Sequence, residues 1–166
     1  MLIRKAADVE LPKIADLHTE SWRNAYSDIL PVSFLDNYLE ETLKHHWQEV
    51  EIRNEDVVLV AEKDELVGFV AVWCRPIPFI DNLHVKPNHR SKGVGSALLK
   101  AMAENLIKEG LNSGYLWVFE NNRDAVRFYE KHGGVQKEKK IKRVFGFEIM
   151  QRKIEWSNLS KILSET

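Results

Sequence analysis

Residues Leu83 to Lys100 combine a strand, a glycine-containing loop and a helix in one short segment, LHVKPNHRSKGVGSALLK. The apolar residues up to Val85 indicate the end of a strand, and a polar turn with Pro87 follows. Beyond the loop, apolar residues recur at the spacing of a helix. The helical positions are Val94, Leu98, Ala101, Met102 and Leu106.

The loop before this helix is suited to bind a pyrophosphate. Glycines let the backbone come close to a ligand and point several N–H groups in one direction. The unpaired N–H groups of the first helical turn and the helix dipole favour a phosphate there. Arg90 and Lys92 add positive charge. The loop consists of Arg90, Ser91, Lys92, Gly93, Val94, Gly95 and Ser96.

The spacing of the glycines separates this loop from two other phosphate-binding loops. A dinucleotide-binding G-x-G-x-x-G motif would need glycine at Leu98, and a P-loop would need G-K-[ST] after four spacer residues. The sequence instead contains R-x-x-G-x-G, at Arg90, Gly93 and Gly95. This pattern resembles the acyl-CoA loop of the GNAT superfamily of N-acetyltransferases. A turn before a capped helix is the alternative interpretation of the loop alone.

A second segment, Val118 to Gly134, resembles the other hallmark of that family, N-x-x-A-x-x-F-Y-E-K-x-G. It reads VFENNRDAVRFYEKHGG. Both hallmarks occur in the family's order, and the resemblance covers essentially the whole chain. Gly134 stands where members of the family commonly have Phe, a departure that affects packing more than chemistry. The matching positions are Asn122, Ala125, Phe128, Tyr129, Glu130, Lys131 and Gly133.

We therefore expect a single domain over residues 1–166 with an α/β fold. The resemblance implies a mixed, mostly antiparallel central sheet with a splayed parallel pair of strands and flanking helices. Apolar patterning predicts strands over 2–5, 57–61, 66–73, 79–85, 115–119, 135–142 and 144–150. It predicts helices over about 12–25, 33–50, 94–109 and 123–132.

The composition limits the classes of function. With 44% hydrophobic and 30% charged residues, the chain matches an ordinary globular protein. The formal net charge of −1 argues against binding nucleic acid through general electrostatics. No apolar run reaches membrane-spanning length, and the first residues lack the apolar core of a signal peptide. Cys74 is the only cysteine, so we expect no intrachain disulfide, no cysteine-based zinc cluster and a cytoplasmic location.

The resemblance implies that acetyl-CoA is the co-substrate. Backbone groups of Leu83, His84 and Val85 would pair with its pantetheine arm, as a peptide pairs with a sheet edge. Asn122 would form a hydrogen bond with the same arm, and Phe128 would line the CoA channel. The glycine loop would hold the pyrophosphate.

Tyr129 is the residue for which the resemblance implies a role in the chemistry. The family's tyrosine at this position donates a proton to the departing CoA thiolate, and a phenol stays protonated at neutral pH. The implied reaction is direct attack of a primary amine on the thioester in a ternary complex, where alignment supplies much of the rate. A backbone N–H near Leu83 or Val85 would stabilise the oxyanion.

Asp81 and His84 are the two candidates for removing a proton from the amine, directly or through water. Regular strand alternation places them on opposite faces of the strand. A bulge would change this, so the sequence leaves the choice between them open.

The acceptor site is the least defined part of the sequence. Trp22, Tyr26 and Glu20 lie in a region that forms part of the acceptor site in the family, and aromatic rings with a carboxylate suit a cationic amine. A place in the core is the alternative for Trp22 and for Trp73. The acceptor is the amine of a small molecule or of a protein or peptide, and the sequence does not choose between them.

Other residues receive structural interpretations. Cys74 suits a buried position better than a covalent mechanism, and His45 and His46 lack the i,i+4 spacing of a helical metal site, so no metal is expected. The basic run 137–143 suits an exposed edge strand. The tail beyond Lys153 has apolar residues at helical spacing and packs either on its own domain or on a second subunit, as a monomer or a homodimer.

Two rival functions differ in class. A catalytically silent acyl-CoA-binding sensor would bind CoA tightly without turnover, and the presence of Tyr129 argues against it. A protein that binds ATP or GTP through the glycine loop would need the missing G-K-[ST] motif and acidic magnesium ligands.

Overall fold

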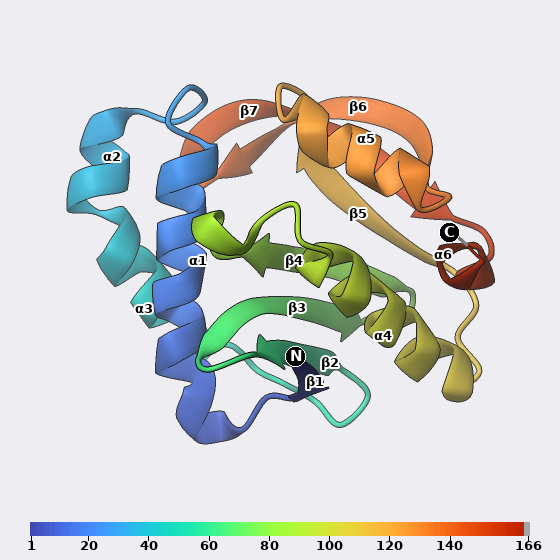
Figure 1. Ribbon diagram of the computed structural model, residues 1–166. Coiled ribbons are helices and arrows are strands. Elements are labelled where there is room, and N and C mark those ends of the chain that lie inside the picture. The colour runs from blue at the N-terminus through green and yellow to red at the C-terminus, as the bar shows by residue number, and fades with distance from the viewer. Residues whose placement is uncertain (165–166) are drawn as a thin grey trace.

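The computed structural model of the protein describes residues 1–164. Within them, seven strands form one sheet in the order β1-β2-β3-β4-β5-β7-β6 (Figure 1). Neighbouring strands are antiparallel except β4 and β5, which are parallel. The expected α/β fold, with a mostly antiparallel sheet and one parallel pair, is confirmed. The strands are β1 (Leu2–Lys5), β2 (Val57–Glu62), β3 (Leu66–Cys74), β4 (Pro78–Val85), β5 (Gly114–Phe119), β6 (Val135–Val144) and β7 (Phe147–Trp156).

One face of the sheet, here called the α1 face, is covered by helices from the first third of the chain. Alternate residues of a strand point to opposite faces, and on this face Val60 and Phe69 are buried against Ile14 and Trp47. The helical elements here are η1 (Asp8–Glu10), α1 (Leu11–Ala25), α2 (Val32–Asn37) and α3 (Leu39–Glu49), with α2 contributing to a separate apolar cluster beside α1.

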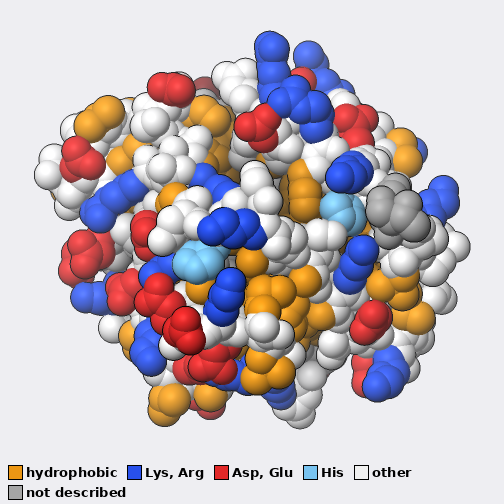
Figure 2. All heavy atoms as spheres, in the orientation of Figure 1, with side chains coloured by type: hydrophobic (Ala, Val, Ile, Leu, Met, Phe, Trp, Pro, Cys, Tyr) orange, Lys and Arg blue, Asp and Glu red, His pale blue; other side chains and the backbone are white. Residues whose placement is uncertain are grey.

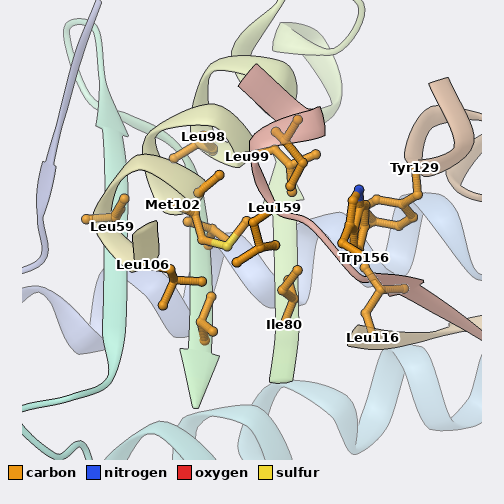
Figure 3. Close-up of a cluster of buried hydrophobic side chains, with 14 of the residues drawn as sticks. Leu59, Ile80, Leu98, Leu99, Met102, Leu106, Leu116, Tyr129, Trp156 and Leu159 are labelled. Atoms are coloured by element: carbon orange, nitrogen blue, oxygen red, sulfur yellow. The ribbon is translucent and has the colours of Figure 1, made fainter. Parts of the chain in front are cut away.

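The opposite face, here called the α4 face, carries the larger core cluster (Figure 3). Side chains of α4 lie against β2, β3 and β4, and Tyr129 lies beside Trp156 at the edge of the same cluster. The helices on this side are α4 (Val94–Lys108), α5 (Arg123–Lys131) and α6 (Ser160–Leu163), and the short η2 (Pro87–His89) lies between β4 and the glycine loop, in contact with α1. The labelled α4 residues in Figure 3 are Leu98, Leu99, Met102 and Leu106.

The predicted helix over 33–50 is two helices, with a break at Tyr38. The carbonyl oxygen of Leu35 accepts a hydrogen bond of 2.8 Å from Arg23 Nε of α1. A carbonyl bonded in this way favours a bend in the chain, and Leu35, Leu39 and Leu43 all stay buried across the break.

The bounds predicted for the last two strands were wrong. The chain turns at Phe145 and Gly146, both with positive φ (49° and 86°), as in a two-residue hairpin. β6 therefore continues to Val144, and β7 continues to Trp156. Beyond β7, the described residues 157–164 include the short helix α6, and Leu159 and Ile162 are buried in the α4-face core, so this part of the tail packs on its own chain. The basic run lies on β6, at the edge of the sheet, as predicted.

Packing in the core explains why position 134 is a glycine, which the sequence alone did not show. A Cβ at this position would lie 2.6 Å from Ile154 Cγ2 and 2.9 Å from the ring of Trp156. The indole of Trp156 thus occupies the space that a side chain at position 134 would need, and it donates a hydrogen bond of 3.0 Å to the carbonyl of His132.

Candidate active site

The sheet opens between its two parallel strands. β4 and β5 are paired at Phe79 and Tyr115, whose rings stack at 5.1 Å, and the two strands diverge beyond this pair. A cleft of about 1240 Å³ fills the divergence, and it is lined by both strands, the glycine loop, α1, α5 and the end of β6. Its volume exceeds the range of about 300–1,000 Å³ typical of sites for drug-sized ligands, so it has room for a large one.

The glycine loop forms one wall of this cleft. Ser91 and Gly93 both have positive φ (61° and 85°), which curves the backbone ahead of the first turn of α4. Successive N–H groups in such a curve form a concavity that binds anions, and the first N–H groups of α4 have no partner within the helix. Gly93, Gly95 and Ser96 line the cleft.

Contacts between α4 and α5 join the two hallmark segments. An added Cβ at Gly95 would lie 3.5 Å from the ring of Phe128. Ser96 Oγ lies 2.8 Å from Nε2 of the buried His132, whose Nδ1 lies 2.9 Å from the carbonyl oxygen of Phe128. Because that carbonyl can only accept, Nδ1 carries the proton and Ser96 donates to Nε2.

Arg90 lies at the loop, and its guanidinium turns toward α1. It donates hydrogen bonds to Asn24 Oδ1, to Ser21 Oγ at 3.1 Å and to the carbonyl of Val85 at 3.3 Å. This side chain therefore ties the loop to α1. Lys92 is exposed, and it is absent from the lining of the cleft, whereas Lys131 of α5 lines it.

Asn122 links the start of α5 to α1. Its Oδ1 accepts a hydrogen bond of 3.4 Å from the backbone of Ala125, as an N-cap. Its side chain is also hydrogen-bonded to Tyr26, whose pKa burial raises to about 12. The predicted site residues Asn122 and Tyr26 thus lie side by side, although they are far apart in the sequence.

Tyr129 of α5 lines the cleft and belongs to the α4-face core. It is 8% exposed, and its ring contacts Phe128 edge-on at 5.3 Å and Trp156 at 6.0 Å. Burial, with a smaller effect of Tyr26, raises the pKa of its phenol. Tyr129 is therefore protonated across the physiological range and can donate a proton into the cleft.

A β-bulge at Asp81 settles the geometry that the sequence left open. Ala71 pairs with Asn82 and Val72 pairs with Ile80, so Asp81 is the extra residue. A bulge shifts the alternation of side chains by one residue. As a result, the side chains of Asp81 and His84 both lie on the α1 face.

Asp81 is exposed at the rim of the cleft. Its Oδ2 accepts a hydrogen bond of 2.9 Å from Trp73 Nε1, and Trp73 packs against Trp47 of α3. This contact explains Trp73 as a residue that holds the carboxylate in place.

His84 is held deeper in the same wall. Ser21 Oγ lies 2.9 Å from its Nδ1, and Trp22 Nε1 donates to its Nε2 at 3.4 Å. An indole N–H can only donate, so Nδ1 carries the proton and Nε2 is the acceptor. Burial, and secondly the charge of Arg90, lowers the pKa of His84 to about 3, so the imidazole is neutral at physiological pH.

His18 is a residue of this site that sequence analysis missed. It is 3% exposed, lines the cleft and packs against the ring of His84 at 4.7 Å. Trp47 Nε1 donates to its Nδ1 at 3.0 Å, and within the described part of the chain its Nε2 has no hydrogen-bond partner. Burial lowers its pKa well below the ordinary value. A lone histidine on a helix carries no sequence signal that could have revealed this position.

The remaining predicted acceptor residues divide into two groups. Trp22 and Tyr26 line the cleft, and their rings contact each other and Phe119. Glu20 is exposed and absent from the lining of the cleft, and it borders a second depression beside α1. The structure brings in Lys142 and Phe145 of the β6–β7 hairpin instead, which sequence analysis did not place here.

Two further features concern metals and membranes. Across residues 1–164, no group of three or more His, Cys, Asp or Glu side chains could hold a metal ion. Over the same residues, no helix has both the length and the apolar character that a membrane span requires.

This combination of a mixed sheet opened at its parallel strand pair, a glycine loop at a helix N-terminus and a buried tyrosine defines a class of acyl-CoA-dependent transferases. Residues 11–134 match the Acetyltransferase (GNAT) family. Because this match covers most of the chain, the protein belongs to the GNAT family, and it is an N-acetyltransferase.

Individual relatives agree with this assignment. The protein described as "Uncharacterized N-acetyltransferase YuaI" of Bacillus subtilis is 25% identical over 170 residues, covering 96% of this chain and 95% of that protein. Spermidine N(1)-acetyltransferase of Thermoplasma acidophilum is 25% identical over 147 residues, covering 79% of this chain and 86% of that protein. The crystal structure of PaiA N-acetyltransferase from Thermoplasma acidophilum in complex with coenzyme A has a TM-score of 0.69 at 22% identity, covering 91% of this chain and 96% of that chain.

Proposed function

We propose that the protein transfers the acetyl group of acetyl-CoA to a primary amine, with both substrates bound in the cleft between β4 and β5. The observation that carries this proposal is the continuity of that cleft, which runs from the glycine loop past Tyr129 to Asp81. The cofactor enters along the loop and the diverging edge of β4, and the amine enters from the α1 face.

The cofactor would be held mainly by backbone groups. The concave N–H groups around Gly93 and the first turn of α4 bind the pyrophosphate, and the edge of β4 from Leu83 to Val85 pairs with the pantetheine arm. Lys131 supplies charge from α5, while Arg90 fixes the loop against α1.

The reaction is a direct displacement. The lone pair of the neutral amine attacks the thioester carbonyl carbon, and a C–N bond forms as the C–S bond breaks. The nitrogen loses one proton, and the departing thiolate takes one proton from the phenol of Tyr129. The products are the acetamide and the free thiol of CoA, and the phenolate regains its proton from solvent.

The proton of the incoming amine leaves through Asp81, His84 or a water between them. The bulge brings both side chains to one face, and Nε2 of neutral His84 would exchange its hydrogen bond from Trp22 for the proton. The two residues remain alternatives as the base.

Calorimetric titration of the purified protein with acetyl-CoA, with ATP and NADH as controls, tests the cofactor assignment. Saturable one-site binding of acetyl-CoA alone is expected. Equal binding of ATP, or no binding of acetyl-CoA, would contradict it. Binding without acetylation of any amine in a broad panel would instead identify a sensor.

We also propose that the protein works in the cytoplasm, as a monomer or a homodimer. Cys74 is free and buried, which fits a reducing compartment. Sedimentation analysis would determine the oligomeric state.

A further inference from the structure

The acceptor end of the cleft carries two opposite charges that are not paired with each other. Asp81 lies on the bulge of β4, and Lys142 reaches in from β6. No ion pair within 4.0 Å joins them in the described part of the chain, and Asp81 Oδ2 accepts a hydrogen bond from Trp73. Both side chains line the same cleft, and they are close enough for the charge of Asp81 to oppose the lowering of the pKa of Lys142 by burial, so one ligand can contact both.

Lys142 is held in place by an aromatic ring. Its Nζ lies 4.3 Å from the centroid of Trp117, on the face of β5 opposite the α4-face core. A cation over an indole face is positioned and partly desolvated, but its N–H donors remain available. Among residues 1–164, no hydrogen bond or ion pair of the Lys142 ammonium is found, whereas the side chain of Arg143 pairs with Glu148 at 3.8 Å. Lys142 is thus an oriented, partly buried ammonium that lacks an anion.

The charged side chains that line the cleft favour a ligand with an anionic group at the acceptor end. The lining contains two carboxylates, Asp81 and Asp124, and Asp124 forms an ion pair with Arg127 on α5. At the acceptor end, the lining contains Asp81 with Lys142 and with Arg143, which is already paired with Glu148. His46 also lines this end, and burial lowers its pKa, which favours the neutral imidazole. Basic side chains also gather at the upper edge of the molecule, over α5 and β6 (Figure 2).

We propose that the acceptor is a small primary amine that also carries a carboxylate, with Lys142 binding the carboxylate and Asp81 receiving the ammonium before its deprotonation. This inference rests on the proposed function. A polyamine fits poorly because a second ammonium would meet Lys142 instead of a second carboxylate. An amine without an anionic group would leave Lys142 unpaired in the complex, at a cost in affinity.

Matched acceptors test this inference directly. The assay measures CoA thiol release with α-, β- and γ-amino acids, each beside its carboxamide, and with spermidine. Rates are expressed per concentration of neutral amine over a range of pH, because an amide and an acid differ in amine basicity. The wild-type protein is expected to prefer one of the acids over its amide by roughly 10-fold or more in kcat/KM, as for a charge-assisted hydrogen bond.

Lys142→Met separates binding by this side chain from general effects. Met keeps an unbranched stem against Trp117 and removes the charge. The variant is expected to lose the preference for the acid through a higher KM, with the KM for acetyl-CoA unchanged. Lys140→Met is the control, because Lys140 is an exposed lysine of the same strand outside the cleft lining. Thermal melting of both variants reports whether the edge strand is intact.

The possible results distinguish this inference from the proposed function. Preference of the wild type for the amides or for spermidine would overturn the inference, and so would an unchanged acid-to-amide ratio in Lys142→Met. In both cases acetylation is still observed, so the proposed function stands. Binding of acetyl-CoA without acetylation of any amine would overturn the proposed function and, with it, the inference.

Discussion

The two sides of the cleft are built in different ways. The cofactor side consists of two continuous strand–loop–helix segments. In the first, Gly93 precedes helix α4, and in the second, Asn122 caps helix α5. The acceptor side is assembled from α1, α3, the bulge of β4 and the β6–β7 hairpin, which are separated by long stretches of chain. This contrast means that the cofactor side is formed by local segments of the chain, whereas the acceptor side depends on the packing of distant ones.

The largest expected effect is on turnover, at Tyr129, which lies where the cofactor side and the acceptor side of the cleft meet. Tyr129→Phe removes the proposed acid, and turnover is expected to fall by about 10²–10⁴-fold, the range for general acid catalysis. The calorimetric affinity for acetyl-CoA should stay within a few-fold of wild type, since the ring and its contacts with Trp156 remain. Tyr38→Phe, at an exposed tyrosine outside the cleft lining, is the control. Full activity of Tyr129→Phe at every pH would remove Tyr129 from the mechanism.

The second prediction concerns the pH dependence of the free energy of unfolding. It tests the acceptor side of the cleft, where His18 and His84 lie. The folded-state pKa of His84, about 3, is below the ordinary value of 6.5. Between these values the unfolded chain binds a proton that the folded chain does not. The free energy of unfolding should therefore fall as the pH drops below 6.5, by up to about 1.4 kcal/mol per pH unit for this residue.

Urea unfolding at pH 7.5, 6.5 and 5.5 measures that slope. His84→Asn should reduce the slope without abolishing it, because the pKa of His18 is lowered as well. His45→Asn, at an exposed position of α3, is the control and should keep the wild-type slope. An identical slope in His84→Asn would mean that His84 is not held neutral by its surroundings.

The smallest expected effect isolates the glycine loop on the cofactor side. Gly93 and Gly110 flank α4, both have positive φ (85° and 81°), and an added Cβ would contact nothing within 4 Å at either position. Gly93→Ala and Gly110→Ala should therefore each lower the free energy of unfolding by a similar amount, about 1–2 kcal/mol, because a side chain disfavours the left-handed backbone conformation. In calorimetry, only Gly93→Ala should also weaken acetyl-CoA binding. Equal affinities in the two variants would argue against a pyrophosphate at the loop.

Local patterns in the sequence were enough to predict the cofactor side. The strand before the loop, the helix from Val94 and the short helix with Tyr129 all occur where apolar spacing and the two hallmark motifs placed them. The reason is physical, because a strand–loop–helix unit is determined by residues that are neighbours in the chain. The bounds of the later hairpin and the break at Tyr38 were missed, since they depend on a two-residue turn and on a contact with Arg23.

By itself, the sequence determined the α/β class, the order of the strands along the chain and the residues of the glycine loop and of the Tyr129 helix. Only the tertiary structure decided which face Asp81 occupies, because one extra residue in β4 reverses the alternation on which a sequence argument depends. It also decided that Arg90 holds α1, that His18 lies against His84, and that Lys142 faces the cleft from a distant edge strand. Each of these contacts joins segments far apart in the chain, and their packing, which local propensity does not encode, brings them together.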